Sequence, residues 1–281
     1  MTQFALTRGV SPDLRACELS FVDRSEIDVA LARQQHLHYQ QALAKLGCTV
    51  LSLPAEAELP DAVFVEDTAL VLDELAVMTR PGAASRRAEV ASVAEILARY
   101  RPLATIAAPA TLEGGDILRH GRSIYVGLSA RSNPEGIRQL ADLVADHGYA
   151  VQAVPMFGCL HLKSAVTLVD DDTVLVHPGW IDPGVFASFR VIEIDAREPH
   201  AANALRVGAG LVYPSCFPRT LERLCSAGIA VSTVDVSELQ KAEGAVTCCS
   251  LLFEVADQAQ GQGRGDGEKS DHVGVVVGKR R

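Results

Sequence analysis

The sequence lacks several features that would assign it to common classes of protein. It contains no run of 18 consecutive apolar residues, which excludes a transmembrane helix. The first twenty residues have no apolar core preceded by basic residues, so we expect no secretory signal peptide. Positive charge is scarce, because 26 Lys and Arg residues stand against 35 Asp and Glu, and the net charge is −9 at pH 7. This balance argues against nucleic acid or an anionic membrane as a partner and suits a small cationic substrate.

Paired cysteines are also absent. The seven cysteines are odd in number and none belongs to a Cys-x-x-Cys motif. This pattern excludes a zinc ribbon and a disulfide framework, and it predicts a reducing, cytoplasmic location. Cys159 and His161 resemble half of a zinc site, but no second pair follows at ligand spacing. The C-terminal glycines do not follow a strand and open a helix, as a dinucleotide loop requires. We therefore expect no metal or organic cofactor.

Length and composition indicate an ordinary globular protein. The 281 residues are 48% hydrophobic and 22% charged, which is enough apolar surface for a sizeable core. Residues 257–281 differ from the rest, because glycine, glutamine and charged residues dominate them. We predict a single catalytic domain over residues 1–256 and a flexible tail over residues 257–281.

A weak internal repeat organises the chain. Four segments place apolar residues around one or two polar ones, as at the edge of a strand; they are 63–71, 111–118, 159–169 and 244–253. Their central polar residues are Glu66, Glu113, His161 and Cys248. The first three centres are nearly evenly spaced, and the last gap is close to two such periods. A degenerate fifth copy, centred on Asn203, fits into that gap.

The segments after each centre repeat as well. Second apolar strands are predicted at 75–80, 123–129, 172–178 and 210–215, and third strands at 104–110, 150–156, 189–194 and 229–236. Amphipathic helices are predicted between them at 85–100, 133–148 and 218–228. Units of this size cannot each bury a face alone, but a radial arrangement can. The period predicts a five-bladed α/β propeller of ββαβ repeats, with a generic α/β sheet as the alternative.

The polar centres contain the parts of a thiol-based active site. If the repeats converge on an axis, Cys248 supplies a nucleophile, His161 a proton carrier and Glu113 a carboxylate that orients it. A thiol attacks only when ionised, so it needs a positive charge from the histidine or from a cationic substrate. The residues alone leave other interpretations open, because a single cysteine is often buried core and a histidine between two leucines is often structural. A cysteine protease is a further alternative.

Charged residues near these centres indicate a ligand with charge at both ends. Asp61, Glu66 and Asp67 lie beside an apolar strand, and burying three carboxylates without a cation is costly. Arg86 and Arg131 begin the helical stretches of two units, where a guanidinium can bind a carboxylate. A cation at one end and a carboxylate at the other describe an amino acid such as arginine.

Six motifs carry a resemblance to a known family. The chain contains, in order, PDAVFVEDTAL, TRPGAASRRAE, LEGGDI, SARSN, LHLKS and GAVTCCSLLF. Together they resemble dimethylarginine dimethylaminohydrolase over residues 10–255. The resemblance implies the five-fold α/β propeller known as the pentein fold and is compatible with a homodimer. It also implies a metal-independent hydrolase that converts Nω-methylated arginines to L-citrulline and methylamine or dimethylamine through a covalent cysteine thiouronium intermediate.

The resemblance also assigns roles to residues. It implies that Cys248 is the nucleophile, His161 the general acid and base, and Glu113 a carboxylate contacting both the histidine and the guanidinium. The implied substrate-binding groups are Glu66 and Asp67 for the guanidinium, Asp61 and the carbonyl of Leu19 for the α-amine, Arg86 and Arg131 for the α-carboxylate, and the backbone of Ala242. Zinc could inhibit by binding Cys248 and His161.

Only one of the adjacent residues Cys248 and Cys249 is expected to be the nucleophile. The family pattern of one cysteine, a variable residue and a serine makes Cys248 catalytic and Cys249 the neighbour. We further expect both to lie on a strand, where successive side chains point to opposite faces, so that only one faces the axis. The alternatives within the superfamily are arginine deiminase and an amidinotransferase, which are typically longer. An alternative of another class is a methylarginine-binding protein without turnover.

Overall fold

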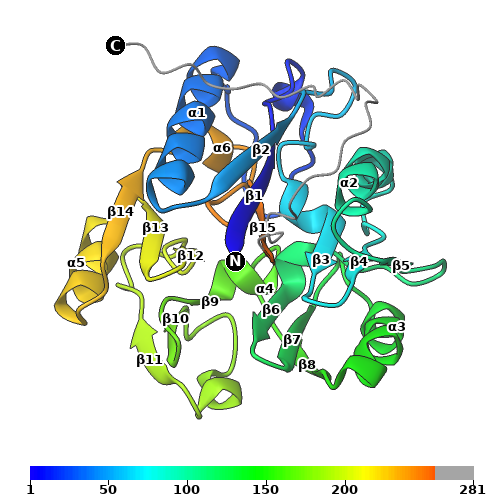
Figure 1. Cartoon of the computed structure of the whole chain (residues 1–281). Coiled ribbons are helices and arrows are strands. Elements are labelled where there is room, and N and C mark those ends of the chain that lie inside the picture. Colours follow the sequence, from blue (N-terminus) through cyan, green and yellow to red (C-terminus); the bar gives the residue numbers. More distant parts are fainter. Residues whose placement is uncertain (257–281) are drawn as a thin grey trace, which may run out of the picture.

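The computed structural model describes residues 1–256, which form five three-stranded sheets around one axis (Figure 1). In every sheet the inner strand pairs antiparallel with the middle strand, and the middle strand pairs parallel with the outer one. The five-bladed α/β propeller predicted from the repeat is confirmed. The predicted tail, 257–281, lies outside the described residues.

The strands follow the predicted order of the repeat. Written from inner to outer strand, the sheets are β3 (Ala69–Val71), β4 (Ala76–Met78) and β5 (Leu103–Thr105); β6 (Ile117–His120), β7 (Ser123–Leu128) and β8 (Ala150–Pro155); β9 (Val166–Leu168), β10 (Thr173–Val176) and β11 (Arg190–Glu193); β12 (Leu205–Val207), β13 (Gly210–Pro214) and β14 (Val231–Val234); and β15 (Leu251–Val255), β1 (Thr2–Arg8) and β2 (Thr49–Leu53). The middle strands β4 and β10 are buried along their whole length. Their near-continuous apolar sequences are typical of strands covered on both faces.

Helices cover the outside of the ring (Figure 1). The connections from middle to outer strand contain α1 (Val29–Lys45), α2 (Glu89–Leu97), α3 (Pro134–Val144) and α5 (Pro218–Ser226); the β10–β11 connection has only the 3₁₀ turn Pro183–Phe186. Helix α3 begins as predicted, because the Asn133 side chain accepts the Gly136 N–H at 2.8 Å and proline occupies the first turn. Two short helices, α4 (Leu162–Ala165) and α6 (Ser237–Gln240), complete the set. No described helix combines the length and apolar character needed to cross a bilayer.

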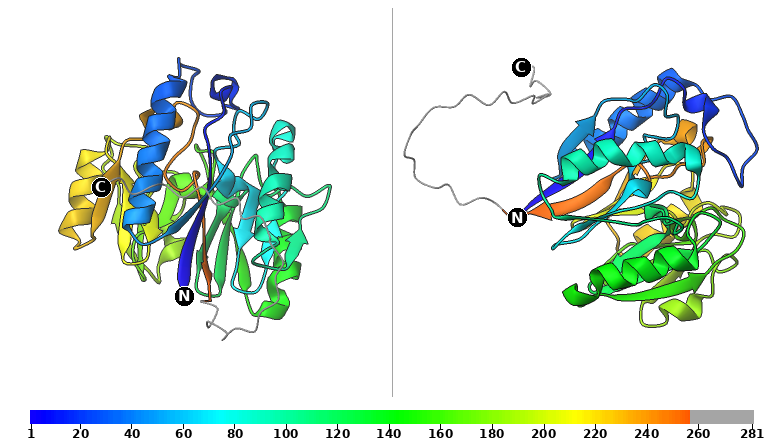
Figure 2. Two further views of the ribbon diagram at one scale, coloured as in Figure 1. Left: turned by 45° about the horizontal axis from the view of Figure 1, so that its top comes forward. Right: turned by 90° about the vertical axis from the view of Figure 1, so that its right-hand side faces the viewer.

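The N-terminal segment closes the ring. Sequence analysis assigned no element to the first 60 residues, yet β1 lies between β15 and β2, and α1 packs beside them. Figure 2 shows β1 running alongside the C-terminal strand β15, with Thr2 opposite Val255. The fifth unit is therefore assembled from both ends of the described chain, and its repeat is split in the sequence.

The polar centres lie in short turns and not within strands. Glu66 belongs to the 3₁₀ turn Val65–Thr68, Glu113 and His161 each precede a short helical turn, and Cys248 lies in the turn before β15. The expectation that Cys248 and Cys249 occupy a strand is wrong, because β15 begins only at Leu251. These turns all end at the start of an inner strand, so they gather at one end of the axis.

Candidate active site

The turns before the inner strands surround a small pocket. Its cavity measures about 20 Å³. Seven of the residues singled out from the sequence line it: Asp61, Asp67, Arg86, Arg131, His161, Ala242 and Cys248. Glu113 is fully buried next to it and is hydrogen-bonded to the histidine. The structure therefore brings together residues from six separate stretches of the sequence.

A buried histidine–carboxylate pair forms one wall. His161 Nε2 donates to Glu113 Oε2 at 2.7 Å, and Asp67 Oδ1 lies 3.9 Å from the same nitrogen. Burial alone would lower the pKa of His161, but Asp67, the hydrogen bond to Glu113 and the nearby Asp116 raise it to about 9. The ring is therefore an imidazolium at neutral pH and can donate a proton.

Gly115 and Asp116, in the turn after Glu113, allow His161 and Asp67 to pack closely against this turn. A Cβ atom on Gly115 would lie 2.5 Å from His161 Nδ1 and 2.8 Å from Asp67 Oδ1, so only glycine allows this approach. The next residue, Asp116, accepts the Leu162 N–H at 3.0 Å and thereby fixes the backbone beside the histidine. Sequence analysis gave Asp116 no role, although it belongs to the motif LEGGDI.

The two cysteines differ in surroundings. Cys248 is half-buried at the pocket, whereas Cys249 is fully buried in the apolar core and its Sγ lies 3.5 Å from the Ala245 carbonyl oxygen. Burial, with the charges of Glu66 and Asp67, raises the pKa of the Cys248 thiol to about 12. The thiol is therefore protonated at neutral pH and needs a cation nearby before it can ionise.

Arg86 is held within the acidic wall. Its Nη1 donates to Asp67 Oδ2 at 2.6 Å, while Nε and Nη2 donate to the two oxygens of Glu89 at 3.1 and 2.8 Å. Despite burial, His161 and Arg86 lower the pKa of Asp67 to about 2. Asp67 is therefore ionised and fixed in place. Sequence analysis missed Glu89, whose only signal was its place in the motif TRPGAASRRAE.

Besides Glu113, which lies buried next to the pocket, two residues of the predicted set do not line it. Glu66 faces away from it: one carboxylate oxygen accepts Lys163 Nζ at 2.5 Å and the other accepts Thr247 Oγ at 2.8 Å. This group borders an axial cavity of about 260 Å³ lined by the inner strands. Leu19 also lies outside the lining, although its neighbour Glu18 is part of it. Sequence analysis did not assign roles to Lys163 or Glu18.

The wall could bind a cation. Asp67, Glu113 and His161 each place one ligand-type atom within 4.8 Å of the others, and all three are buried. The carboxylates of Asp67 and Glu113 are already paired with the His161 imidazolium and the Arg86 guanidinium, so a planar organic cation would share them.

Comparisons with known proteins identify relatives of the chain. The sequence model of the arginine deiminase family matches residues 55–205. The dimethylarginine dimethylaminohydrolase of Streptomyces coelicolor is 40% identical over 256 residues, covering 90% of this chain and 98% of that protein. The enzyme of the same name from Pseudomonas aeruginosa is 38% identical over 228 residues, covering 80% and 90%.

Solved structures give the same result. The Pseudomonas aeruginosa enzyme, as a cysteine-to-serine variant complexed with citrulline, aligns with a TM-score of 0.86 at 35% identity, over 90% of this chain and all of that one. A histidine-to-glycine variant of a dimethylarginine dimethylaminohydrolase, as an adduct with S-methyl-L-thiocitrulline, aligns with the same TM-score of 0.86 at 35% identity. The N-terminal domain of the arginine dihydrolase ArgZ shares the fold at 18% identity with a TM-score of 0.78. On the identity and coverage of its relatives, this chain belongs to the dimethylarginine dimethylaminohydrolase family.

Proposed function

We propose that this protein hydrolyses Nω-methylated arginines to L-citrulline and methylamine or dimethylamine. The observation that carries the proposal is the buried imidazolium of His161, held by Glu113 and Asp67 in the wall of the pocket that Cys248 lines. This arrangement combines a nucleophile, a proton donor and a cation site in one small space. The names of the relatives and the citrulline complex support the same reaction.

The charges suggest how the thiol is activated. The substrate guanidinium binds beside Asp67 and Glu113, and its positive charge lowers the pKa of the Cys248 thiol, which ionises and releases its proton to solvent. The thiolate attacks the guanidinium carbon, and His161 protonates the amine as its C–N bond breaks. A covalent thiouronium remains on the cysteine. His161, now neutral, takes a proton from water, which attacks the same carbon; the C–S bond then breaks and releases citrulline and the thiolate.

The side chains of Arg86 and Arg131 differ in how many close hydrogen bonds they already make within the protein. The guanidinium of Arg86 is bonded to Asp67 and Glu89, whereas Arg131 makes only longer contacts, 3.5 Å to Glu113 and 3.2 Å to Ser20 Oγ. We therefore propose that Arg131 is the main ligand of the α-carboxylate and that Arg86 chiefly positions Asp67. The roles implied for Glu66, Leu19, Asp61 and Ala242 stay predictions. Glu66 would act on the guanidinium site indirectly, through its bonds to Lys163 and Thr247.

A substrate panel tests the proposed function. Purified protein is incubated with asymmetric dimethylarginine, monomethylarginine, arginine and agmatine, and citrulline and released amine are quantified. We expect citrulline from the two methylated arginines. Ammonia release from unmodified arginine as the main reaction would indicate an arginine deiminase. Protection of the thiol by substrate without any citrulline would indicate a binding protein.

Removal of Arg131 tests the carboxylate site. We expect Arg131→Leu to raise KM for methylarginine roughly 10- to 100-fold, because a charged hydrogen-bond donor to the substrate is lost. The matched control is Arg99→Leu, which replaces an exposed arginine. Agmatine lacks the α-carboxylate, so we expect it to be a poor substrate of the unmodified enzyme. Efficient agmatine hydrolysis would contradict the role of Arg131.

Metal ions provide another test. We expect activity to survive strong chelators and zinc to inhibit in competition with substrate, because Cys248 and His161 are ready zinc ligands. Both must lose a proton to bind zinc, and their pKa values lie near 12 and 9. Inhibition should therefore strengthen as pH rises, by roughly tenfold per pH unit for each proton displaced. Activity lost in chelator and restored by zinc would contradict the metal-independent reaction.

The surroundings of the enzyme remain predictions. All seven cysteines are free thiols, and this supports a reducing, cytoplasmic location. A homodimer and the single-domain organisation of residues 1–256 also stay predictions.

A further inference from the structure

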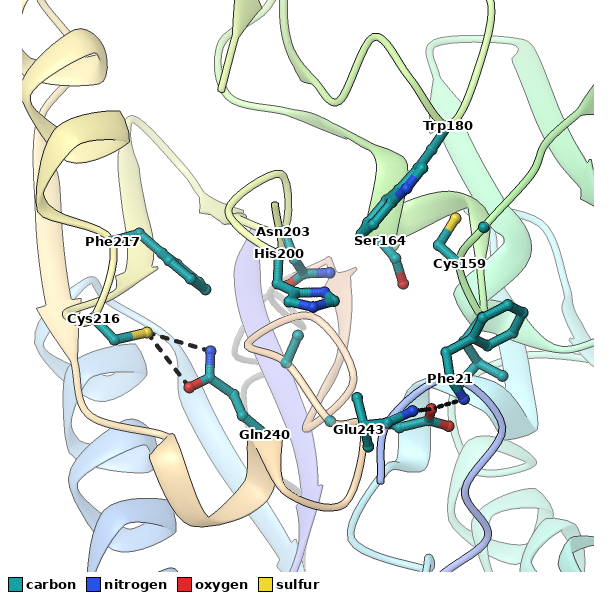
Figure 3. Close-up of a pocket in the computed structure, with 15 residues that line it drawn as sticks. Phe21, Cys159, Ser164, Trp180, His200, Asn203, Cys216, Phe217, Gln240 and Glu243 are labelled. Carbon is teal, nitrogen blue, oxygen red and sulfur yellow. Dashed lines mark hydrogen bonds between the residues drawn. The ribbon is translucent and has the colours of Figure 1, made fainter. Parts of the chain in front are cut away.

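Glu243 has a conformation that needs an explanation. Its φ is 57°, and within residues 1–256 no other residue except glycine has a positive φ. This conformation is unfavourable for a side chain with a Cβ, and it persists only where other contacts hold it. The Glu243 carboxylate accepts three consecutive backbone N–H groups, from Ser20 and Val22 at 2.8 Å each and from Phe21 between them. Figure 3 shows the carboxylate directed at the backbone of Phe21.

The segment that it holds, residues 18–22, borders the substrate pocket. Its Glu18 N–H donates to Asp61 Oδ2 at 3.1 Å, and its Ser20 Oγ accepts Arg131 Nη2 at 3.2 Å. Asp61 and Arg131 are the residues expected to bind the amino-acid end of the substrate. Segment 18–22 is therefore attached to the amino-acid end of the site on one side and to Glu243 on the other.

The pocket at Cys248 is too small for an arginine, so one of its walls must move before substrate can enter. The pocket that holds Cys248 has a cavity of about 20 Å³, which is the size of a single water molecule and too small for an arginine. A second cavity of about 300 Å³ adjoins it, and the two share Leu160, Glu243 and Gly244. Phe21 and Val22 line this second cavity, and Figure 3 shows Phe21 and Glu243 side by side at its edge.

Of the walls of this pocket, segment 18–22 should need the least free energy to move. It contains no regular secondary structure, and Phe21 is 50% exposed. Four charged residues of the other walls are buried, in turns that lead into β3, α2, α3 and β9; they are Asp67, Arg86, Arg131 and His161. Segments with few buried contacts open first in folded proteins.

We propose that Glu243 is a positioning residue that latches segment 18–22 over the bound substrate. Rupture of its three hydrogen bonds opens the pocket toward the larger cavity, and their formation presses the segment onto Asp61 and Arg131. The left-handed backbone of Glu243 is what directs its carboxylate at the segment. Only the identity of the ligand under the latch rests on the proposed function; the latch itself does not.

The test uses Glu243→Ala in the full-length protein, with Asp23→Asn as the matched control. Asp23 is exposed one residue beyond the held segment, so this control removes the same charge without touching the latch. Two quantities are measured: hydrogen exchange at the amides of Ser20, Phe21 and Val22, and KM and kcat for methylarginine. In Glu243→Ala we expect exchange at these amides roughly tenfold faster or more. KM should rise roughly tenfold while kcat stays within about threefold, because Cys248, His161 and Glu113 are untouched. The control should match the parent in both.

A second variant separates the latch from folding. Glu243→Gly also removes the carboxylate, but glycine takes a positive φ without strain, so its melting temperature should equal or exceed that of Glu243→Ala. We expect the same rise in KM and in amide exchange. Parent-like exchange and KM in either variant would overturn the proposal. A parent protein that forms no citrulline would overturn the proposed function instead, and amide exchange would still test the latch.

Discussion

Replacement of Cys248 by serine is expected to lower citrulline formation by a factor on the order of 10⁴ or more, because the nucleophile of a covalent mechanism is lost. A serine hydroxyl has a much higher pKa than a thiol, and two carboxylates, Glu66 and Asp67, already oppose ionisation at this position. Mass spectrometry of the unmodified enzyme during turnover should show the thiouronium adduct on the peptide that contains Cys248. The variant should show none.

Cys249→Ala is the matched control for this experiment. Cys249 is fully buried among apolar side chains and does not line the pocket, so its loss should cost about 1 kcal/mol of stability and leave kcat within a few fold. Both variants change one sulfur in the same turn, which separates chemistry from packing. An active Cys248→Ser protein with an inactive Cys249→Ala protein would contradict the assignment of the nucleophile.

The three residues of the proposed catalytic group could be placed together from the sequence because they occupy equivalent positions in a repeat. Glu113, His161 and Cys248 each precede an inner strand, so one period in the sequence places all three at the same end of the axis. The period also predicted the order of strands in four of the five sheets. It could not show that these residues lie in turns, because a turn that leads into a short strand has the same apolar pattern as the strand.

Features that depend on contacts between distant segments could not be predicted. Strand β1 pairs with β15 across almost the whole chain, so no local pattern indicates that the N-terminal segment completes the fifth blade. The direction of a side chain in a turn follows no period either. The resemblance implies that Glu66 acts at the guanidinium, and this role stays a prediction; in the structure its carboxylate is bonded to Lys163 and Thr247. Glu243 carried no signal, because its role comes from its backbone conformation and from three amides more than 200 residues away.

Glu113→Gln is expected to shift the pH dependence of the reaction as well as its rate. The pKa of His161 lies near 9 although burial opposes its charge, and Glu113 supplies one of the interactions that hold it there. Glutamine keeps the size of the side chain but removes its negative charge. The pKa of His161 should therefore fall, and the ring should lose its proton at a lower pH than in the parent.

A lower pKa of His161 should move the alkaline decline of kcat/KM to lower pH. His161 donates a proton to the departing amine, so activity requires the imidazolium and declines as pH rises through its pKa. In the parent that decline should lie near pH 9. In Glu113→Gln it should move to lower pH, and kcat/KM at pH 7.5 should fall on the order of 10²- to 10³-fold. The measurements are kcat/KM from pH 5.5 to 10 and an NMR titration of the His161 ring. Glu95→Gln, which changes an exposed glutamate on α2, is the control. A reduced rate with an unshifted alkaline decline would show that Glu113 acts on the substrate alone and does not hold the proton on His161.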